Sequence, residues 1–207
     1  MKEHHDARPA RRKTGRPLSF DREVALEQAM LTFWRHGYES TSIVDLTTAM
    51  GVTAPSLYGA FGDKRQLFLE AARRYAGDPD AMARRIADAS TAYAAASAML
   101  TGAAVAYTGE TTPRGCLLAS ATASGSAAAC DVQAAVADIR RSIAACIEAR
   151  IAVDVANGTL PNATLPSALA GLVMAVAQGM SVLARDGAPR ESLLSIVDAT
   201  LAGWPRV

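Results

Sequence analysis

The stretch from Thr41 to Lys64 constrains the fold most, because it predicts two short helices that meet at a tight glycine corner. Apolar residues recur at spacings of three and four on the first helix, as expected for one buried face: Ile43, Val44, Leu46, Ala49 and Met50. Ser42 stands just before that face and Asp45 follows three residues later, a spacing that resembles a capping box. We therefore expect a helix that begins near Ser42 and ends at Gly51.

The second short helix follows the corner directly. Gly51 can adopt the left-handed conformation that ends a helix, and Thr53 can then cap a new helix with Pro55 in its first turn. That helix extends to about Phe61. Two short helices joined by about three residues that include a glycine are typical of the helix-turn-helix unit, which places its second helix in the major groove of DNA. The helix pair alone is weak support, because many small helical proteins contain one.

The whole run from Gly15 to Tyr75 gives a stronger signal, because it resembles the tetracycline-repressor (TetR) family. The matching residues are Gly15, Arg16, Pro17, Trp34, Arg35, His36, Gly37, Tyr38, Thr41, Ser42, Ile43, Asp45, Leu46, Ala49, Gly51, Val52, Ser56, Leu57, Tyr58, Phe61, Gly62, Asp63, Lys64 and Leu67. Beyond this run, only helix order and the segment from Pro113 to Leu118 look familiar. The resemblance implies an N-terminal three-helix helix-turn-helix domain followed by a larger helical domain for ligand binding and dimerisation.

Composition also favours an all-α protein. Hydrophobic residues make up 50% of the chain, alanine is abundant, and no sustained alternating run of β-branched residues occurs. We expect four parts: a basic flexible arm in residues 1–18, the helix-turn-helix domain in 19–62, a connecting helix in 63–77, and an effector-binding and dimerisation domain in 78–207. The charged segment 1–17 lacks the apolar core of a secretory signal, so we expect a cytoplasmic protein.

The charge is unevenly distributed. The net charge is only +1, but Lys and Arg exceed Asp and Glu by three in residues 1–77 and fall short by two in residues 78–207. Much of the excess lies in the arm, in Arg8, Arg11, Arg12, Lys13 and Arg16. A flexible basic arm attracts phosphates without regard to sequence, and such arms in helix-turn-helix proteins reach the minor groove. A solvated tail without a partner is the alternative.

The family resemblance also implies a set of DNA contacts. The residues expected nearest to base edges are Thr53, Ala54, Pro55 and Ser56. Tyr58 is expected to bond a phosphate and Lys64 to meet the DNA backbone, since a phenol and an ammonium both offer donors. Thr41 and Ser42 stand at a helix N-terminus, where free N–H groups favour a phosphate oxygen.

Gly59 and Ala60 depart from the commoner family pattern, which often has an aromatic residue and a histidine there. Gly59 still lies on the expected outward face, but its departure puts one phosphate contact in doubt. No arginine or glutamine lies on that face, so specificity would depend on apolar contacts and on DNA shape.

The central helices are expected to enclose a small-molecule effector, as the family resemblance implies. The candidate pocket walls are Tyr93, Met99, Leu100, Ala103, Tyr107, Leu117, Thr122, Ile139, Ile143, Met174 and Gln178. Few aromatic and charged residues are among them, so we expect a modest, mostly apolar ligand. The small-residue run from Ser120 to Cys130 either packs tightly or leaves room for such a ligand.

The chain has three cysteines and three histidines, the residues that most often bind metals or act in catalysis. Cys116, Cys130 and Cys146 lack metal-ligand spacing, and we expect reduced thiols, of which Cys116 is the best candidate for reactivity. All three histidines lie in the first 36 residues, so no nucleophile–base pair can be proposed in the larger domain. We expect neither a metal nor a cofactor, and no enzymatic activity.

The last two predicted helices are candidates for the dimer interface. Leu165 to Leu183 carries no charged residue, which raises the question of a membrane span, but Pro166, Gln178 and its glycines argue against one. The interface residues expected are Gly171, Ala175, Gly179, Leu193, Val197, Leu201 and Trp204. Small residues four apart permit close approach, and the last helix has a near-heptad stripe.

The sequence thus predicts a homodimeric transcriptional repressor that a small molecule releases from a near-palindromic operator. A dimeric protein-interaction module that no longer binds DNA is the main alternative, and a small helical enzyme is a weaker one.

Overall fold

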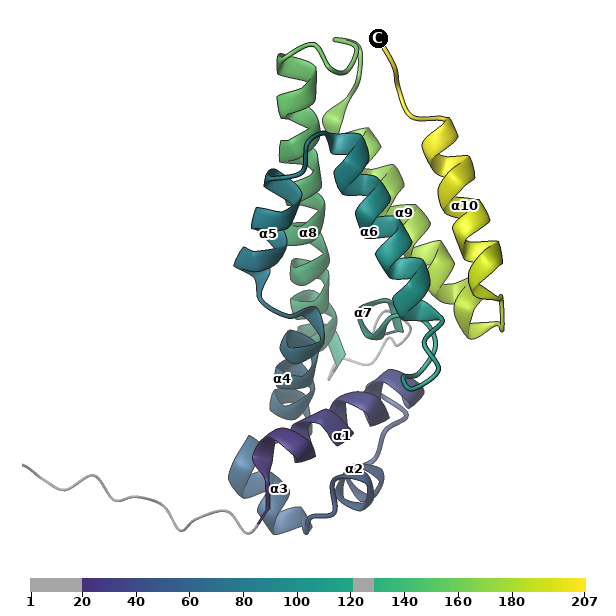
Figure 1. Cartoon of the computed structure of the whole chain (residues 1–207). Coiled ribbons are helices and arrows are strands. Elements are labelled where there is room, and N and C mark those ends of the chain that lie inside the picture. The colour runs from purple at the N-terminus through teal and green to yellow at the C-terminus, as the bar shows by residue number, and fades with distance from the viewer. Residues whose placement is uncertain (1–19, 121–128) are drawn as a thin grey trace, which may run out of the picture.

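The computed structural model describes residues 20–120 and 129–207, and every regular element in these ranges is a helix. The helices are α1 (Arg22–His36), α2 (Ile43–Met50), α3 (Ala54–Phe61), α4 (Lys64–Ala76), α5 (Pro79–Ala87), α6 (Ala92–Tyr107), α7 (Leu117–Ser120), α8 (Cys130–Ala156), α9 (Pro166–Arg185) and α10 (Arg190–Ala202). Figure 1 shows α1, α2 and α3 at one end of the molecule, with α4 leading from them toward the other helices. We call α1–α4 the N-terminal unit and α5–α10 the body. The all-α prediction is confirmed.

The corner between α2 and α3 forms as predicted. The Ser42 hydroxyl accepts a hydrogen bond from the Asp45 N–H at 3.1 Å, and the Asp45 carboxylate accepts one from the Ser42 N–H at 2.8 Å, so the capping box is complete. Gly51 ends α2 with a φ of 65°, a conformation that costs glycine little. Thr53 then caps α3 through the Ser56 N–H.

Aromatic side chains fill the core of the N-terminal unit. The Phe33 and Phe68 rings meet edge to face at 5.0 Å, and Tyr38 meets Phe68 at 5.1 Å. Trp34 is also buried and lies edge-on to Tyr75 at 4.8 Å. Trp34 is therefore a core residue, and Tyr38 packs against the same core.

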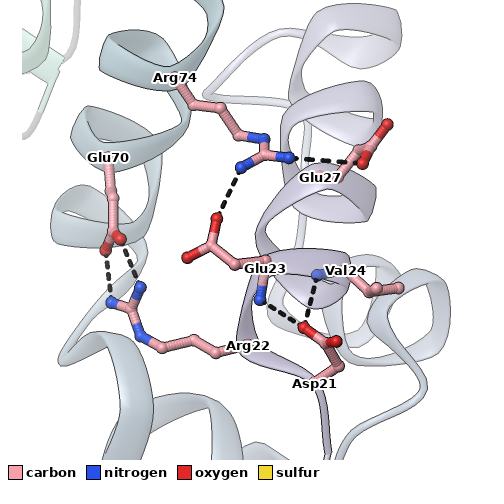
Figure 2. Close-up of polar contacts among 7 residues, drawn as sticks. All are labelled: Asp21, Arg22, Glu23, Val24, Glu27, Glu70 and Arg74. Carbon is pink, nitrogen blue, oxygen red and sulfur yellow. Dashed lines mark hydrogen bonds and ion pairs between the residues drawn. The ribbon is translucent and has the colours of Figure 1, made fainter.

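Ion pairs fasten α4 to α1 (Figure 2). The Arg22 guanidinium donates to both carboxylate oxygens of Glu70, at 2.6 and 2.7 Å, and stacks 4.4 Å from the centre of the Phe61 ring. Arg74 donates to Glu23 at 2.7 Å and lies 3.5 Å from Glu27. These groups are partly exposed, so each pair contributes at most about 1 kcal/mol. Their value is directional, because Arg22 of α1 and Arg74 of α4 each reach across to the other helix and so fix its angle.

The body is built on small buried side chains. The buried face of α6 is Ala92, Ala95, Ala96, Leu100 and Ala104, and this face packs on α9 and α10. At the far end, a buried pair joins Arg150 and Asp154 of α8 at 2.7 Å. Asp154 also accepts a hydrogen bond from the Ala92 N–H at 2.7 Å, and Arg150 donates to Ala89 and Ser90 carbonyls. The pair therefore clamps the start of α6 onto α8.

The two units share one apolar core. Leu117 and Leu118 of α7 and Val132 and Val136 of α8 belong to the same buried cluster as the α1 and α4 core residues. A helix as short as α7 is held by these neighbours and not by its own hydrogen bonds. The N-terminal unit therefore rests on an apolar platform that the body supplies.

Polar bonds at the same junction involve Gly115. The Trp34 indole N–H donates to the Gly115 carbonyl at 3.1 Å, and Arg185 of α9 donates to the Trp34 carbonyl at 3.0 Å. Gly115 has a φ of 81°, and a Cβ there would lie 2.8 Å from the Ser181 carbonyl oxygen. Only glycine fits this close approach between the loop before α7 and α9.

Helix α9 is long and apolar enough to cross a membrane by length and composition, with a mean hydropathy of 1.7 over its most apolar window. In the structure it contacts α6, α8 and α10, and Val173, Ala177 and Met180 belong to the body core. Buried core helices meet the same two criteria.

Candidate nucleic-acid interface and effector region

Helix α3 is anchored by two buried residues and exposes the rest of its surface. Leu57 and Phe61 are buried on the N-terminal unit. Thr53, Pro55, Tyr58 and Gly59 are exposed, and Ala54 and Ser56 are half-buried. The Tyr58 side chain is 48% exposed. The five α3 residues expected to meet DNA and the cap residue Thr53 therefore lie on an accessible face of one rigidly seated helix.

The Thr53 and Ser56 hydroxyls are already bonded to each other at 2.9 Å. Each oxygen keeps further hydrogen-bonding capacity, since a hydroxyl has one donor and two acceptor sites. The cap thus holds both short side chains in a fixed position at the N-terminal end of α3. This end is the part of a recognition helix that contacts base edges.

Lys64 is half-buried beside α2. Its ammonium lies 4.6 Å from the centre of the Tyr38 ring and donates to the Glu39 carbonyl at 3.3 Å. Burial lowers the pKa of Lys64, and the acidic neighbours Glu39 and Asp45 oppose that shift. The side chain is therefore held in one place at the start of α4, close to the N-terminus of α2.

The structure corrects the expectation for Thr41. Thr41 is 1% exposed, and its hydroxyl donates to the Gly37 carbonyl at 2.6 Å, so this side chain closes the turn after α1 and offers nothing to DNA. Ser42 is exposed, but its N–H and hydroxyl both donate to Asp45. The Ser42 N–H is thus bonded to the carboxylate of Asp45, the capping-box partner that the sequence indicated, and is not free for a phosphate.

The predicted apolar face of α2 was also partly wrong. Leu46 and Met50 are buried, whereas Val44 is 71% exposed and Ala49 is exposed. In a helix of two turns, only a narrow stripe reaches the core, and the spacing rule assigned too many residues to it. Val44 is therefore an exposed apolar group that the sequence analysis missed as a candidate surface residue.

The basic residues Arg11, Arg12, Lys13 and Arg16 lie outside the described residues, and so does the pocket candidate Thr122. Their predicted roles stay predictions.

The remaining pocket candidates fall into two groups. Leu100 and Leu117 are fully buried in apolar clusters. The other candidates on α6, α8 and α9 are half-buried: Met99, Ala103, Tyr107, Ile139, Ile143, Met174 and Gln178. Tyr93 does not belong with them, because it is 42% exposed and packs on Trp204 at the end of the body far from α1.

Cys116 forms a polar cluster that the sequence analysis did not assemble. The Tyr75 and Tyr107 side chains both hydrogen-bond Cys116, and burial, followed by this cysteine's charge, raises the pKa of both phenols. Both tyrosines therefore remain protonated at neutral pH. The Cys116 N–H donates to the Ser181 hydroxyl at 2.8 Å. The cluster thus joins α4, α6, α9 and the loop before α7 at the junction between the two units.

Arg140 of α8 lies at the edge of the Cys116 cluster. It donates to the Leu118 carbonyl at 2.7 Å, and burial lowers its pKa while the charge of Cys116 opposes that shift. Arg114, the basic residue nearest to Cys116 in the sequence, instead donates to the Ala184 carbonyl of α9 at 2.7 Å. The separation of Cys116 and Arg140 in sequence explains why only the fold brings them together.

The residues predicted for the dimer interface also fall into two groups, one exposed and one buried. Gly171, Ala175 and Gly179 lie on the exposed face of α9. Leu193, Val197, Leu201 and Trp204 are buried within the chain itself. The stripe on α10 therefore packs on α6 and α9 and offers little surface to a second copy, which corrects the prediction for these four residues. A near-heptad stripe of apolar residues can pack within one chain as well as between two copies, so the pattern alone does not distinguish the two.

An exposed helix of a helix-turn-helix corner, seated on a small aromatic core and joined to a larger helical body, defines a DNA-binding transcriptional regulator. Residues 25–71 match the family described as "Bacterial regulatory proteins, tetR family". The chain is 32% identical to the HTH-type transcriptional repressor ComR of Escherichia coli K12 over 199 residues, 95% of each protein. The chain belongs to the TetR family of transcriptional regulators and is not an enzyme.

Two solved structures extend the comparison over the whole fold. A cysteine-substituted form of the TetR family regulator CifR, in complex with 26-bp double-strand operator DNA, is 36% identical with a TM-score of 0.86, over 92% of this chain and 100% of that one. A TetR regulator from Rhodococcus sp. RHA1 is 37% identical with a TM-score of 0.61, over 89% of this chain and 100% of that one. The similarity thus includes the body as well as the DNA-binding end.

Proposed function

We propose that this regulator is a cytoplasmic repressor that a small-molecule effector releases from a near-palindromic operator. The observation that supports the proposal best is the outward face of α3, whose short hydroxyls, apolar groups and Tyr58 phenol lie accessible on an anchored helix. In this proposal Thr53, Ala54, Pro55 and Ser56 meet base edges, and Tyr58, Gly59 and Lys64 follow the phosphates. The basic arm expected in residues 1–18 adds sequence-independent attraction.

A gel-shift titration on DNA from upstream of the protein's own gene tests this proposal. We expect saturable binding that weakens steeply as salt is raised, because phosphate contacts release counterions. Failure to bind any duplex selected from a random pool at low salt would contradict it and would favour the protein-interaction alternative.

The shared core supports a proposed role for each of three parts of the chain. We propose that residues 19–62 read DNA, that 63–77 transmit movement, and that 78–207 bind the effector and dimerise. The half-buried side chains of α6, α8 and α9 are the proposed effector contacts. Nearly complete release requires the effector to prefer the released conformation by about 5.5 kcal/mol.

The Cys116 cluster is the proposed route from effector to DNA. Tyr107 lies among the proposed effector contacts, and Tyr75 belongs to α4, which the ion pairs of Arg22 and Arg74 fasten to α1. An effector that displaces Tyr107 would disturb its bond to Cys116 and hence the seat of α4. Thermal-shift screening of small molecules identifies effectors, since a ligand of the folded state raises the melting temperature.

Dimerisation is proposed through the exposed face of α9. That face carries Gly171, Leu172, Ala175, Gly179, Val182 and Leu183, an apolar strip along most of the helix. Two copies joined there would hold two α3 helices about 34 to 36 Å apart, the spacing of successive major grooves. Isologous pairing explains why the operator should be near-palindromic.

Sedimentation of Leu183→Glu tests this interface. We expect monomers with unchanged helicity, because the side chain is exposed and a buried carboxylate pair would be costly. Val153→Glu, an exposed apolar residue on α8, is the matched control and should remain dimeric. A dimeric Leu183→Glu variant would place the interface elsewhere.

A further inference from the structure

A surface depression lies where the C-terminal end of α1 meets the loop before α7 and the end of α9. Its volume is about 720 Å³, and its lining includes Trp34, Arg35, Glu110, Arg114 and Arg185. Its lining includes no residue of α3 and none of the proposed effector contacts on α6, α8 and α9. Nothing in the proposed DNA contacts or effector contacts accounts for it.

The depression is rich in positive charge. Three guanidinium groups line it against the single carboxylate of Glu110. Among the described residues, Arg35, Arg114 and Arg185 have no ion pair with any carboxylate. Uncompensated guanidinium groups that share a concave surface raise the local concentration of anions.

Backbone bonds hold two of these arginines in place without neutralising them. Arg114 donates to the Ala184 and Ala188 carbonyls, and Arg185 donates to the Trp34 carbonyl at 3.0 Å. The Trp34 and Ala184 carbonyls lie in the last turns of α1 and α9, where partial negative charge would otherwise repel an anion, and the Ala188 carbonyl lies in the loop after α9. The arginines therefore cover that charge and still have N–H groups free of protein acceptors in the described structure.

Arg35 differs from its two neighbours, because it forms no hydrogen bond in the described structure and is exposed. It belongs to α1, whereas Arg114 and Arg185 belong to the body. A ligand held by all three would bridge the two units. Planar guanidinium groups pair with carboxylate and phosphate oxygens through two parallel hydrogen bonds, which makes these the fitting chemistries.

We propose that this depression binds a small anion with at least two negative charges, carried by phosphate or by paired carboxylates, and that the bound anion fixes the N-terminal unit against the body. The binding site stands on its own geometry, whereas its effect on DNA binding rests on the proposed function. The effect of the anion on DNA binding is therefore tested separately from the binding of the anion itself.

Isothermal titration calorimetry measures the binding step without DNA. The full-length protein is titrated with sodium phosphate in one series and sodium citrate in another, at constant pH and ionic strength. Arg35→Gln should weaken binding of the anion about tenfold, the loss of one charged hydrogen-bond pair at an exposed position. Arg73→Gln is the matched control, because Arg73 is also an exposed arginine in the last turn of a helix, and it should bind as the parent does.

The two titrations distinguish the chemistries. Binding of phosphate alone assigns the site to phosphoryl groups, binding of citrate alone assigns it to carboxylates, and sensitivity to Arg35→Gln is required in either case. Absence of binding at millimolar concentrations of both anions, or equal affinity in the parent and in Arg35→Gln, would overturn the proposal.

Gel shifts at constant ionic strength then test the regulatory consequence. The binding anion should change operator affinity in the parent and in Arg73→Gln but not in Arg35→Gln. An equal change in all three proteins would mean simple competition with phosphates and would overturn the regulatory step. Failure to bind any DNA would contradict the proposed function while leaving the calorimetric result intact.

Discussion

The N-terminal unit and the body solve the same problem, packing amphipathic helices, with different side chains. The unit interlocks Phe33, Tyr38 and Phe68 edge to face, whereas the body packs α6 on its neighbours largely through alanine. Large side chains of defined shape admit one arrangement, and small ones leave helix positions less strictly specified. The comparison teaches that the part that meets DNA is built to keep its shape, and the part proposed to bind effectors is built to adapt.

The largest expected effect comes from the aromatic core. Phe68→Ala should lower the free energy of unfolding by about 4 kcal/mol, because it removes a fully buried ring that touches two others. Urea unfolding followed by circular dichroism measures this loss. The body variant Ala96→Gly, also fully buried, should cost about 1 kcal/mol through helix propensity. Equal losses at the two sites would break the comparison.

The buried ion pair is the exception within the body. Asp154→Asn should cost about 3 kcal/mol, since it leaves the buried Arg150 charge without its partner. Asp138→Asn is the control, because Asp138 pairs with Arg141 at an exposed site and should lose less than about 1 kcal/mol. Thermal unfolding compares both variants with the parent. A stable Asp154→Asn protein would show that the clamp at α6 is dispensable.

Surface changes on α3 should separate DNA binding from stability. Tyr58→Ala should weaken binding to all operator variants alike, by about tenfold, because a phosphate contact carries no sequence information. Ser56→Ala should instead change the order of preference among operators. Both melting temperatures should stay close to that of the parent, as Tyr58 is exposed and the Thr53 cap remains. The reverse pattern of binding would reassign the two contacts.

The smallest expected effect concerns the capping box of α2. Hydrogen bonds from Ser42 lower the pKa of Asp45 below its ordinary value of 3.8. A folded-state pKa below the unfolded one means that the stabilisation is complete above pH 3.8 and is lost as the pH falls through the folded-state value. Ser42→Ala should cost about 1 kcal/mol at neutral pH.

Acid titration of the α2 variant provides the check. The difference in the free energy of unfolding between the parent and Ser42→Ala should shrink as the pH falls below 3.8, because a protonated Asp45 carboxyl accepts the bond from the Ser42 hydroxyl less well. Part of the difference should remain, because the Ser42 hydroxyl still accepts the bond from the Asp45 N–H. A constant difference between the two proteins at all pH values would show that the carboxylate contributes nothing to the cap.

The sequence predicted the N-terminal unit better than the body for a physical reason. Caps and glycine turns are local, so Ser42, Gly51 and Thr53 define their structure within a few residues. These caps and turns were enough to predict the helices of the corner and the accessible face of α3. The apolar spacing on α2 failed at Val44, because a short helix buries only a narrow stripe.

Contacts between distant segments could not be inferred in the same way. Thr41 looked like a helix-start donor until the turn placed its hydroxyl on Gly37. The stripe containing Leu193 and Leu201 fits a partner subunit or the chain's own α6, and only the fold decides between them. The Cys116 cluster draws one residue from each of several helices, and its members are far apart in sequence.

The apolar platform under α1 and α4 limits how this regulator can be rebuilt. Leu117, Leu118, Val132 and Val136 complete a core whose other members lie before residue 77. Cutting the chain after α4 would leave that core open to solvent, so an isolated DNA-reading fragment should aggregate. A hybrid repressor could join these DNA-binding helices to the ligand-binding body of another protein. It should fold only when that body supplies apolar side chains that complete the core as these leucines and valines do.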